Sequence, residues 1–214
     1  LSSVIRPYRI FQQGGSYFNT PDFLNTAHSI ANKADCDAYL ARLDAFATNL
    51  DNDSEVQKAE AARGYLAPGW SLDLTLGQLA KLRGQPSAQS TLVHSLVKRA
   101  AAANVAGNWQ SQASAILDGK IYPALDRQIA LLKQLRGTTK AGDGLWRVPR
   151  GQEIYAAALN QATTTDFTPQ QVHEMGLAQV ADISAQLDTI LKGQGLTKGS
   201  VGARLAQLNA DPAQ

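Results

Sequence analysis

The sequence predicts an all-α protein, a bundle-like array of helices with at most one short extended segment. Apolar residues recur at spacings of three and four over most of the 214 positions, which is the period of one helix face. Helix starts and stops are also readable, as capping residues before the apolar runs and basic-then-glycine pairs after them. Strand signals are confined to residues 145–148 and the threonine run 163–165, because consecutive β-branched residues are unfavourable in a helix.

Three helices are expected before residue 66. The first begins at Thr20-Pro21, and its apolar residues are Phe23, Leu24, Ala27 and Ile30. The second begins at Asp35 or Asp37, and its apolar side is formed by Tyr39, Leu40, Leu43, Phe46 and Leu50. Asn52 with Glu55 three residues later resembles a capping box, which predicts a third helix from Asn52 to about Tyr65.

A break at residues 66–69 separates these helices from the next ones. Helical spacing covers residues 71–83, and a further helix after Pro86 runs into the alanines at 100–103. The longest segment is 109–136, in which Pro123 should bend the helix or split it, because proline lacks a backbone N–H. Arg83-Gly84 and Arg136-Gly137 have the pattern of helix stops.

Residues 144–177 form the most informative part of the sequence, with a Trp-Pro-Gly turn, a tyrosine-bearing helix and a complete helix start. Thr168 is a suitable N-cap, Pro169 fits the first helical position, and Gln171 can complete a capping box. The apolar face of the helix that follows contains Val172, Gly176, Val180, Ile183, Leu187 and Ile190. Lys192-Gly193 is expected to end it, with the glycine turning left-handed.

Composition narrows the class of protein. The chain has 44% hydrophobic and 18% charged residues, as folded soluble domains do, and scattered basic residues with a net charge of +2 argue against nucleic-acid binding. No apolar stretch is long enough to be a transmembrane segment.

The single Cys36 excludes an internal disulfide and is expected to be a small, partly buried side chain. Because the chain opens at Leu1 without a signal segment, we expect a processed or excised piece of a longer protein, whose export signal could have been removed.

No catalytic residue or metal ligand is predicted within this chain. His173-Glu174 matches half of the His-Glu-x-x-His zinc motif, but Leu177 occupies the position of the second histidine. His28 and His94 fall on separate predicted helices without a local ligand partner. All three histidines are therefore interpreted as structural or surface residues.

The substrate-cleft candidates are Trp146, Arg147, Tyr155 and the run Thr163, Thr164 and Thr165. Arg147 could meet a carboxylate and Tyr155 could donate a hydrogen bond, and both belong to the irregular, glycine-bracketed region in which functional residues concentrate. The alternative is a solvated arginine and a core tyrosine. An extended threonine segment could pair with the backbone of a peptide substrate.

At this region the sequence resembles the bacterial DUF885 family. The resemblance is carried by Gly144-Leu145-Trp146, Pro149, Gly151, Tyr155, Thr163-Thr164-Thr165, Thr168-Pro169, Val172-His173, Gly176-Leu177 and Val180. Similar positions nearer the start are Phe23-Leu24, His28, Tyr39-Leu40, Arg42-Leu43, Gly64 and Pro68. The resemblance covers most of the chain, in order.

The resemblance implies a mostly helical zinc-dependent peptidase, often exported or lipid-anchored, whose metal motif lies downstream of the threonine run. Residues 1–214 would then be the N-terminal helical portion of a larger protein, with a sub-boundary near 137–145. This portion would be inactive alone, and zinc would be the cofactor of the parent protein only. Its partners would be the remainder of its own polypeptide and a peptide substrate, in the bacterial periplasm or envelope rather than the cytoplasm. Two alternatives remain: a non-enzymatic helical binding or scaffold domain of the envelope, and an enzyme whose site is built from dispersed residues.

Overall fold

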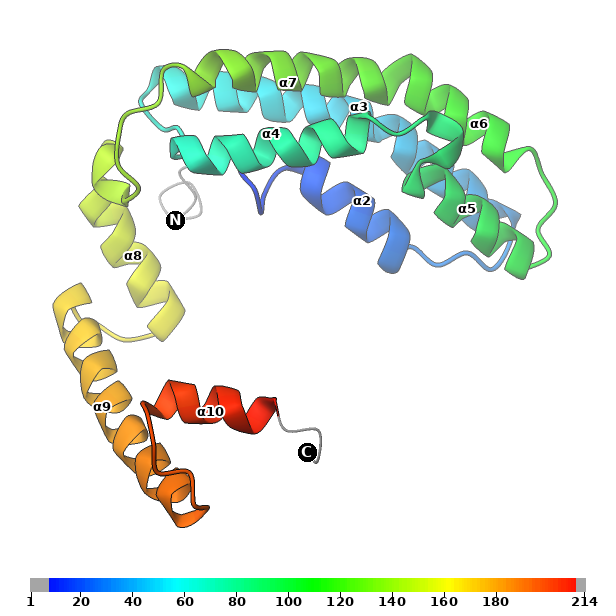
Figure 1. Cartoon of the computed structure of the whole chain (residues 1–214). Coiled ribbons are helices and arrows are strands. Elements are labelled where there is room, and N and C mark those ends of the chain that lie inside the picture. Colours follow the sequence, from blue (N-terminus) through cyan, green and yellow to red (C-terminus); the bar gives the residue numbers. More distant parts are fainter. Residues whose placement is uncertain (1–7, 211–214) are drawn as a thin grey trace. The chain divides into compact units, whose positions relative to one another are not determined.

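A computed structural model describes residues 8–210, and their regular secondary structure is helical. The α-helices are α2 (Ser16–Thr26), α3 (Lys33–Ala62), α4 (Gly69–Arg83), α5 (Thr91–Ala102), α6 (Trp109–Ile116), α7 (Tyr122–Arg136), α8 (Gly151–Thr163), α9 (Pro169–Gly193) and α10 (Val201–Asn209) (Figure 1). Within the described range no strand occurs, and Phe11 and Gly14 form an isolated bridge. The predicted all-α class is confirmed.

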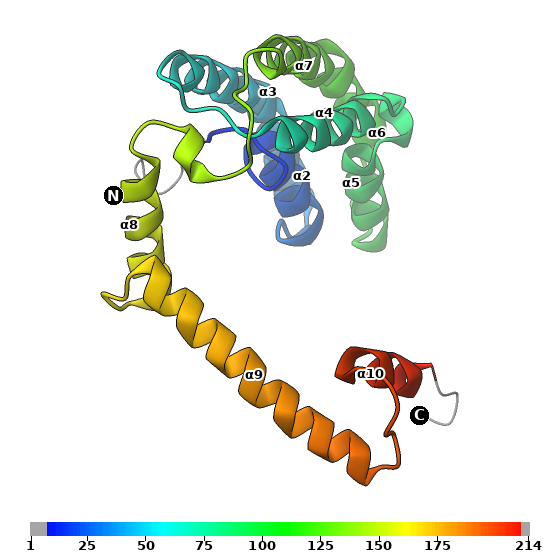
Figure 2. The same ribbon diagram turned by 60° about the vertical axis from the view of Figure 1, so that its left-hand side comes forward.

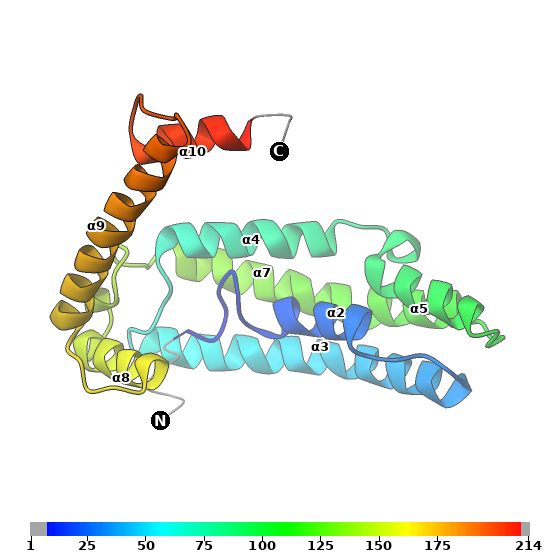
Figure 3. The ribbon, with the colours of Figure 1, turned by 90° about the horizontal axis from the view of Figure 1, so that it is seen from below.

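The chain divides into two compact units, Leu1–Tyr155 and Ala156–Gln214. The division falls inside α8, further along the chain than the sub-boundary predicted near 137–145. In the first unit α7 lies alongside both α3 and α4, as Figures 1 and 3 show. Helix α2 packs against α3 and α5.

The longest helix, α3, contradicts the prediction of a separate helix beginning at Asn52. It begins with a capping box between Asn32 and Asp35 and continues through Asn52 to Ala62. The acidic residues around Asn52 have tertiary partners instead of a capping role. Asp53 is buried and accepts hydrogen bonds from Arg9 and from the backbone N–H of Ser16. The pattern at Asn52 therefore does not mark a helix start, because the neighbouring Asp53 carboxylate bonds residues that are distant in sequence.

The same carboxylate explains why α2 begins earlier than predicted. Its first residue is Ser16 rather than Thr20, and the 2.5 Å bond from the Ser16 N–H to Asp53 satisfies one of the N–H groups left free at a helix start. Pro21 lies inside the helix, which ends at Thr26, so Ile30 falls outside it. The residues at 66–68 remain a break, as predicted, and α4, α5 and α7 end at or within one residue of the predicted stops.

The predicted effect of Pro123 on the long helical segment is confirmed. Five residues, Leu117–Ile121, form a π-helical turn between α6 and α7, and the N–H of Tyr122 donates to the carbonyl of Leu117. Pro123 then falls in the first turn of α7, where its missing N–H costs least. Leu117 and Ile121 are both fully buried, so the segment keeps its contact with the core through the irregular turn.

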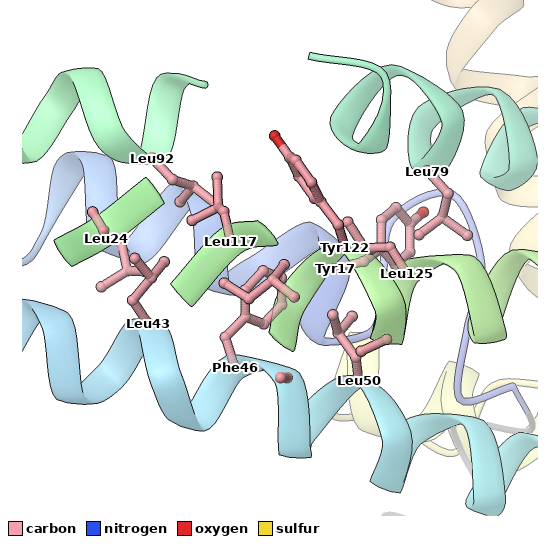
Figure 4. Packing of buried hydrophobic residues seen from close by; sticks show 14 of the residues in the cluster. Tyr17, Leu24, Leu43, Phe46, Leu50, Leu79, Leu92, Leu117, Tyr122 and Leu125 are labelled. Carbon is pink, nitrogen blue, oxygen red and sulfur yellow. The ribbon is translucent and has the colours of Figure 1, made fainter. Parts of the chain in front are cut away.

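The hydrophobic core of the first unit is built mainly from α3, α4, α5 and the α6–α7 segment. In Figure 4, Leu43, Phe46 and Leu50 of α3 face the side of the core that holds Leu117 and Leu125. The buried Gln128 amide nitrogen donates to the carbonyl of Leu50 at 3.0 Å, whereas its Oε1 atom has no hydrogen-bond partner. Cys36 is fully buried in this core rather than partly buried, and its burial raises the pKa of the thiol.

The second unit contains α9 and α10, and Figure 2 shows the turn between them. Helix α9 begins as predicted, with the Thr168–Gln171 capping box and Pro169 in the first turn. Its end differs in one respect. Gly193 is still helical, and Gly195 is the glycine with a positive φ of 82°, which lets Leu196 N–H donate back to the carbonyl of Leu191.

None of the helices in the described part of the chain has both the length and the apolar character needed to cross a membrane.

Candidate functional site

Arg147 lies in the loop between α7 and α8 and connects this loop to other parts of the first unit through hydrogen bonds. Its guanidinium donates to the carbonyl of Leu66 at 3.1 Å, and at 3.4 Å to the carbonyl of Lys140 and the hydroxyl of Tyr8. The residue is only 7% exposed, and its Nε atom is buried without a hydrogen-bond partner. The alternative of a solvated arginine is therefore wrong, because protein oxygens hold the guanidinium. Burial raises the pKa of Tyr8, and the Arg147 charge opposes this rise.

Trp146, the neighbouring residue, is 74% exposed. It belongs to a 3-10 turn, Leu145–Arg147, so the predicted extended conformation at 145–148 is wrong. The turn depends on glycines, because a Cβ at Gly144 would overlap the Trp146 ring and one at Gly151 would overlap the carbonyl oxygen of Leu145. The sequence did not distinguish Trp146 from Arg147 as cleft candidates. In the 3-10 turn, the Trp146 side chain is exposed and the Arg147 side chain is buried.

Tyr155 lies on α8 and is 50% exposed, which excludes the alternative of a core tyrosine. At the start of the same helix, Arg150 forms a 2.5 Å ion pair with Glu153. The hydrogen bond from Arg150 lowers the pKa of the Glu153 carboxyl. The exposed aromatic rings of Trp146 and Tyr155 are thus the two cleft candidates of the first unit that are free to meet a ligand.

The threonine run is not extended, so the conformation expected for this segment is wrong. Thr163 is the last residue of α8, and its hydroxyl donates to the carbonyl of Leu159 at 2.8 Å. Thr164 has a positive φ of 55°. The hydroxyls of Thr163 and Thr165 are 2.8 Å apart, and the Asn160 amide donates to the carbonyl of Thr165. Hydroxyl bonds to nearby backbone compete with regular structure, and here they occur where the helix ends.

Two hollows in the surface of the first unit lie away from these candidates. One of about 500 Å³ opens at the start of α6 and is lined by Val97, Gly107, Asn108, Trp109, Gln110, Ser111 and Ser114. Another, of about 350 Å³, is lined by Pro21, Asp22, Asn25, Gln78, Lys81, Leu82, Gln85, Thr91 and Leu92. Neither contains Trp146, Arg147 or Tyr155 in its lining.

The three histidines lie on different elements. His28 is buried, its Nε2 is 2.9 Å from the carbonyl of Asp35, and its Nδ1 is 2.5 Å from the Arg42 guanidinium. Because an arginine can only donate, Nδ1 must accept and Nε2 must carry the proton. His94 is on α5 and His173 is on α9, both exposed. Within the described residues, His, Cys, Asp and Glu side chains form no group of three or more that could hold a metal ion.

Sequence reasoning missed one feature of the second unit. The sequence places an apolar face on α9, but Leu191 is the only buried residue of this 25-residue helix. Its apolar periodicity was visible in the sequence, whereas the lack of a covering element was not.

Comparisons with known proteins agree on the family and the fold. The family model described as "Bacterial protein of unknown function (DUF885)" matches residues 3–214. A solved structure described as "the putative lipoprotein from Colwellia psychrerythraea" is similar, with a TM-score of 0.92 and 26% sequence identity. The similarity covers 97% of this chain and 36% of that one, so the chain spans about a third of the length of the protein it matches. No curated protein matches the chain.

Proposed function

The chain belongs to the DUF885 family of bacterial proteins, and we propose from this premise that it is the N-terminal helical region of a zinc-dependent peptidase-like protein of the bacterial envelope. In this proposal the catalytic and metal-binding groups lie in other parts of the polypeptide, and these helices support them. The observation that supports a longer parent protein is the 97% coverage of this chain against 36% of the similar structure. The zinc and peptidase parts of the proposal rest on the family resemblance. The word lipoprotein in the description of that structure supports the envelope location.

The histidines of this chain do not fit a zinc site. Zinc in peptidases is held by three protein ligands with an open position for water. Both ring nitrogens of His28 already have protein partners, and Leu177 stands where a second ligand would follow His173. In the whole protein a zinc ion would polarise the substrate carbonyl and activate water. No step of that reaction is assigned to residues of this chain.

The contribution of this chain to a substrate cleft would come from its exposed aromatic residues. Trp146 and Tyr155 present large, partly apolar rings to solvent, and such rings are frequent in ligand-binding surfaces. Arg147 would be a positioning residue, because its hydrogen bond to the Leu66 carbonyl fixes the turn that carries Trp146. Thr163, Thr164 and Thr165 would shape the turn before α9 rather than bind a peptide strand.

Peptide hydrolysis measured on two proteins tests this proposal. One is the 214-residue chain, and the other is the product of the complete reading frame that encodes it. We expect hydrolysis of a mixed peptide library by the longer protein only, abolished by a zinc chelator and restored by zinc. Hydrolysis by the 214-residue chain itself would contradict the proposal, and a longer protein that is inactive with bound zinc would favour the scaffold alternative.

A further inference from the structure

Helix α9 has an apolar stripe that the other residues of the second unit leave exposed. We define the α9 stripe as Met175, Val180, Ile183 and Ile190, together with the partly buried Val172 and Leu187. Successive stripe residues are three, five, three, four and three positions apart, which places them on one side of the helix. Val180 is 64% exposed and Ile190 60%. From Val172 to Ile190 the stripe is about 27 Å long at 1.5 Å per residue.

Within the second unit, α10 covers only the end of α9. The contact is made by Arg204, which is buried and bonds Asp188 and the carbonyl of Leu196. Leu191, the buried residue of α9, lies at this end. The remainder of the stripe has the pattern of a core-facing helix but the exposure of a surface one. Contiguous apolar surface of this kind marks a site of interaction.

The charges of α9 favour a protein partner over a lipid surface. The polar side carries Glu174, Asp182 and Asp188, against Lys192, which already pairs with Asp188 at 2.7 Å. Helices that lie on membranes have polar faces rich in Lys and Arg, because anionic lipids attract them. An acidic helix would be repelled by such a surface.

The similar structure indicates where the partner would come from. The matched region is 36% of that chain, so most of that protein lies outside the helices described here. We propose that the α9 stripe is the docking surface for an apolar helix in the remaining polypeptide of the same protein. The inference rests on the proposed function in one respect, namely that this chain is part of a longer protein; it does not require zinc or peptidase activity.

Hydrogen exchange of the α9 amides tests the docking. We expect exchange at least ten-fold slower in the product of the complete reading frame than in the 214-residue chain, because a packed helix opens less often. The variant Val180→Gln with Ile183→Gln, in the longer protein, should lose this protection. The matched control, Ala178→Gln with Ala185→Gln, changes the opposite side of the helix and should keep it. Far-UV circular dichroism of each variant checks that the helices persist.

Other outcomes would overturn the proposal. Equal exchange of α9 in both proteins would do so, as would a reading frame that ends at Gln214. A dimer of the 214-residue chain that protects α9 and is abolished by the stripe variant would assign the surface to a second copy. Binding of the chain to phosphatidylglycerol–phosphatidylcholine vesicles through the stripe would assign it to lipid. A longer protein that protects α9 but neither binds zinc nor cleaves peptides would remove the proposed function and leave the docking intact.

Discussion

Replacing Arg147 by alanine separates an anchoring role from a substrate-binding role. The substitution removes a charged donor from the buried carbonyl of Leu66, a bond of 3.1 Å. A hydrogen bond from a charged group contributes about 1.5–3 kcal/mol, whereas the two bonds of 3.4 Å are near the limit of useful geometry and add little. With the packing of the aliphatic stem included, we expect a loss of about 2–4 kcal/mol in the free energy of unfolding. For a chain of this size that corresponds to a fall in Tm of about 5–15 °C.

Thermal and urea unfolding followed by far-UV circular dichroism measure this loss. Arg150→Ala is the matched control, because Arg150 lies three residues further along and its ion pair with Glu153 is exposed. Exposed pairs contribute little, so the Tm of this variant should match that of the unchanged protein. Equal Tm values for Arg147→Ala and Arg150→Ala would refute the anchoring role and reopen Arg147 as a ligand-binding residue.

Two further predictions concern the loop glycines and the second unit. Gly151→Ala should lower the unfolding free energy by about 2–4 kcal/mol, because the new Cβ would overlap a backbone carbonyl. Gly77→Ala, in an open helical position, should raise the unfolding free energy by about 0.5–1 kcal/mol. Calorimetry of the two variants measures both changes. Hydrogen bonds from Lys192 and Arg204 lower the pKa of Asp188. The docking of α10 should therefore be intact above about pH 4 and be lost as the pH falls through the lowered value. Amide NMR shifts of α10 measure this loss, and Asp188→Asn should abolish its pH dependence.

The helices that sequence predicted well are those whose ends are determined locally. The Thr168–Gln171 capping box and Pro169 fix the start of α9 within one turn. Pro123 fixes the irregular turn of the longest segment in the same way, since the missing N–H is a property of the residue itself.

The error at Asn52 arose because a distant residue replaced a local signal. Asn52 has the pattern of a helix start, but Asp53 bonds Arg9 and the start of α2, so α3 continues. The Asp53 pairings depend on tertiary structure, which spacing in the sequence does not encode. The threonine run is a different case: it has the composition of a strand, but its hydroxyls bond carbonyls one and four residues away, so the competing signal was itself local.

The candidate cleft was predictable in composition but not in orientation. Trp146 and Arg147 are adjacent, and only the 3-10 turn decides that one is exposed and the other buried. Exposure of the α9 stripe was likewise not predictable, because an apolar helix face has the same sequence whether or not it is covered.

Zinc titration of the purified 214-residue chain by calorimetry is the most direct test of the view that the metal ligands lie elsewhere. We predict no saturable, stoichiometric uptake by this chain and about one tightly bound zinc in the longer protein. Stoichiometric binding by the 214-residue chain, lost on replacing His94 or His173, would contradict it.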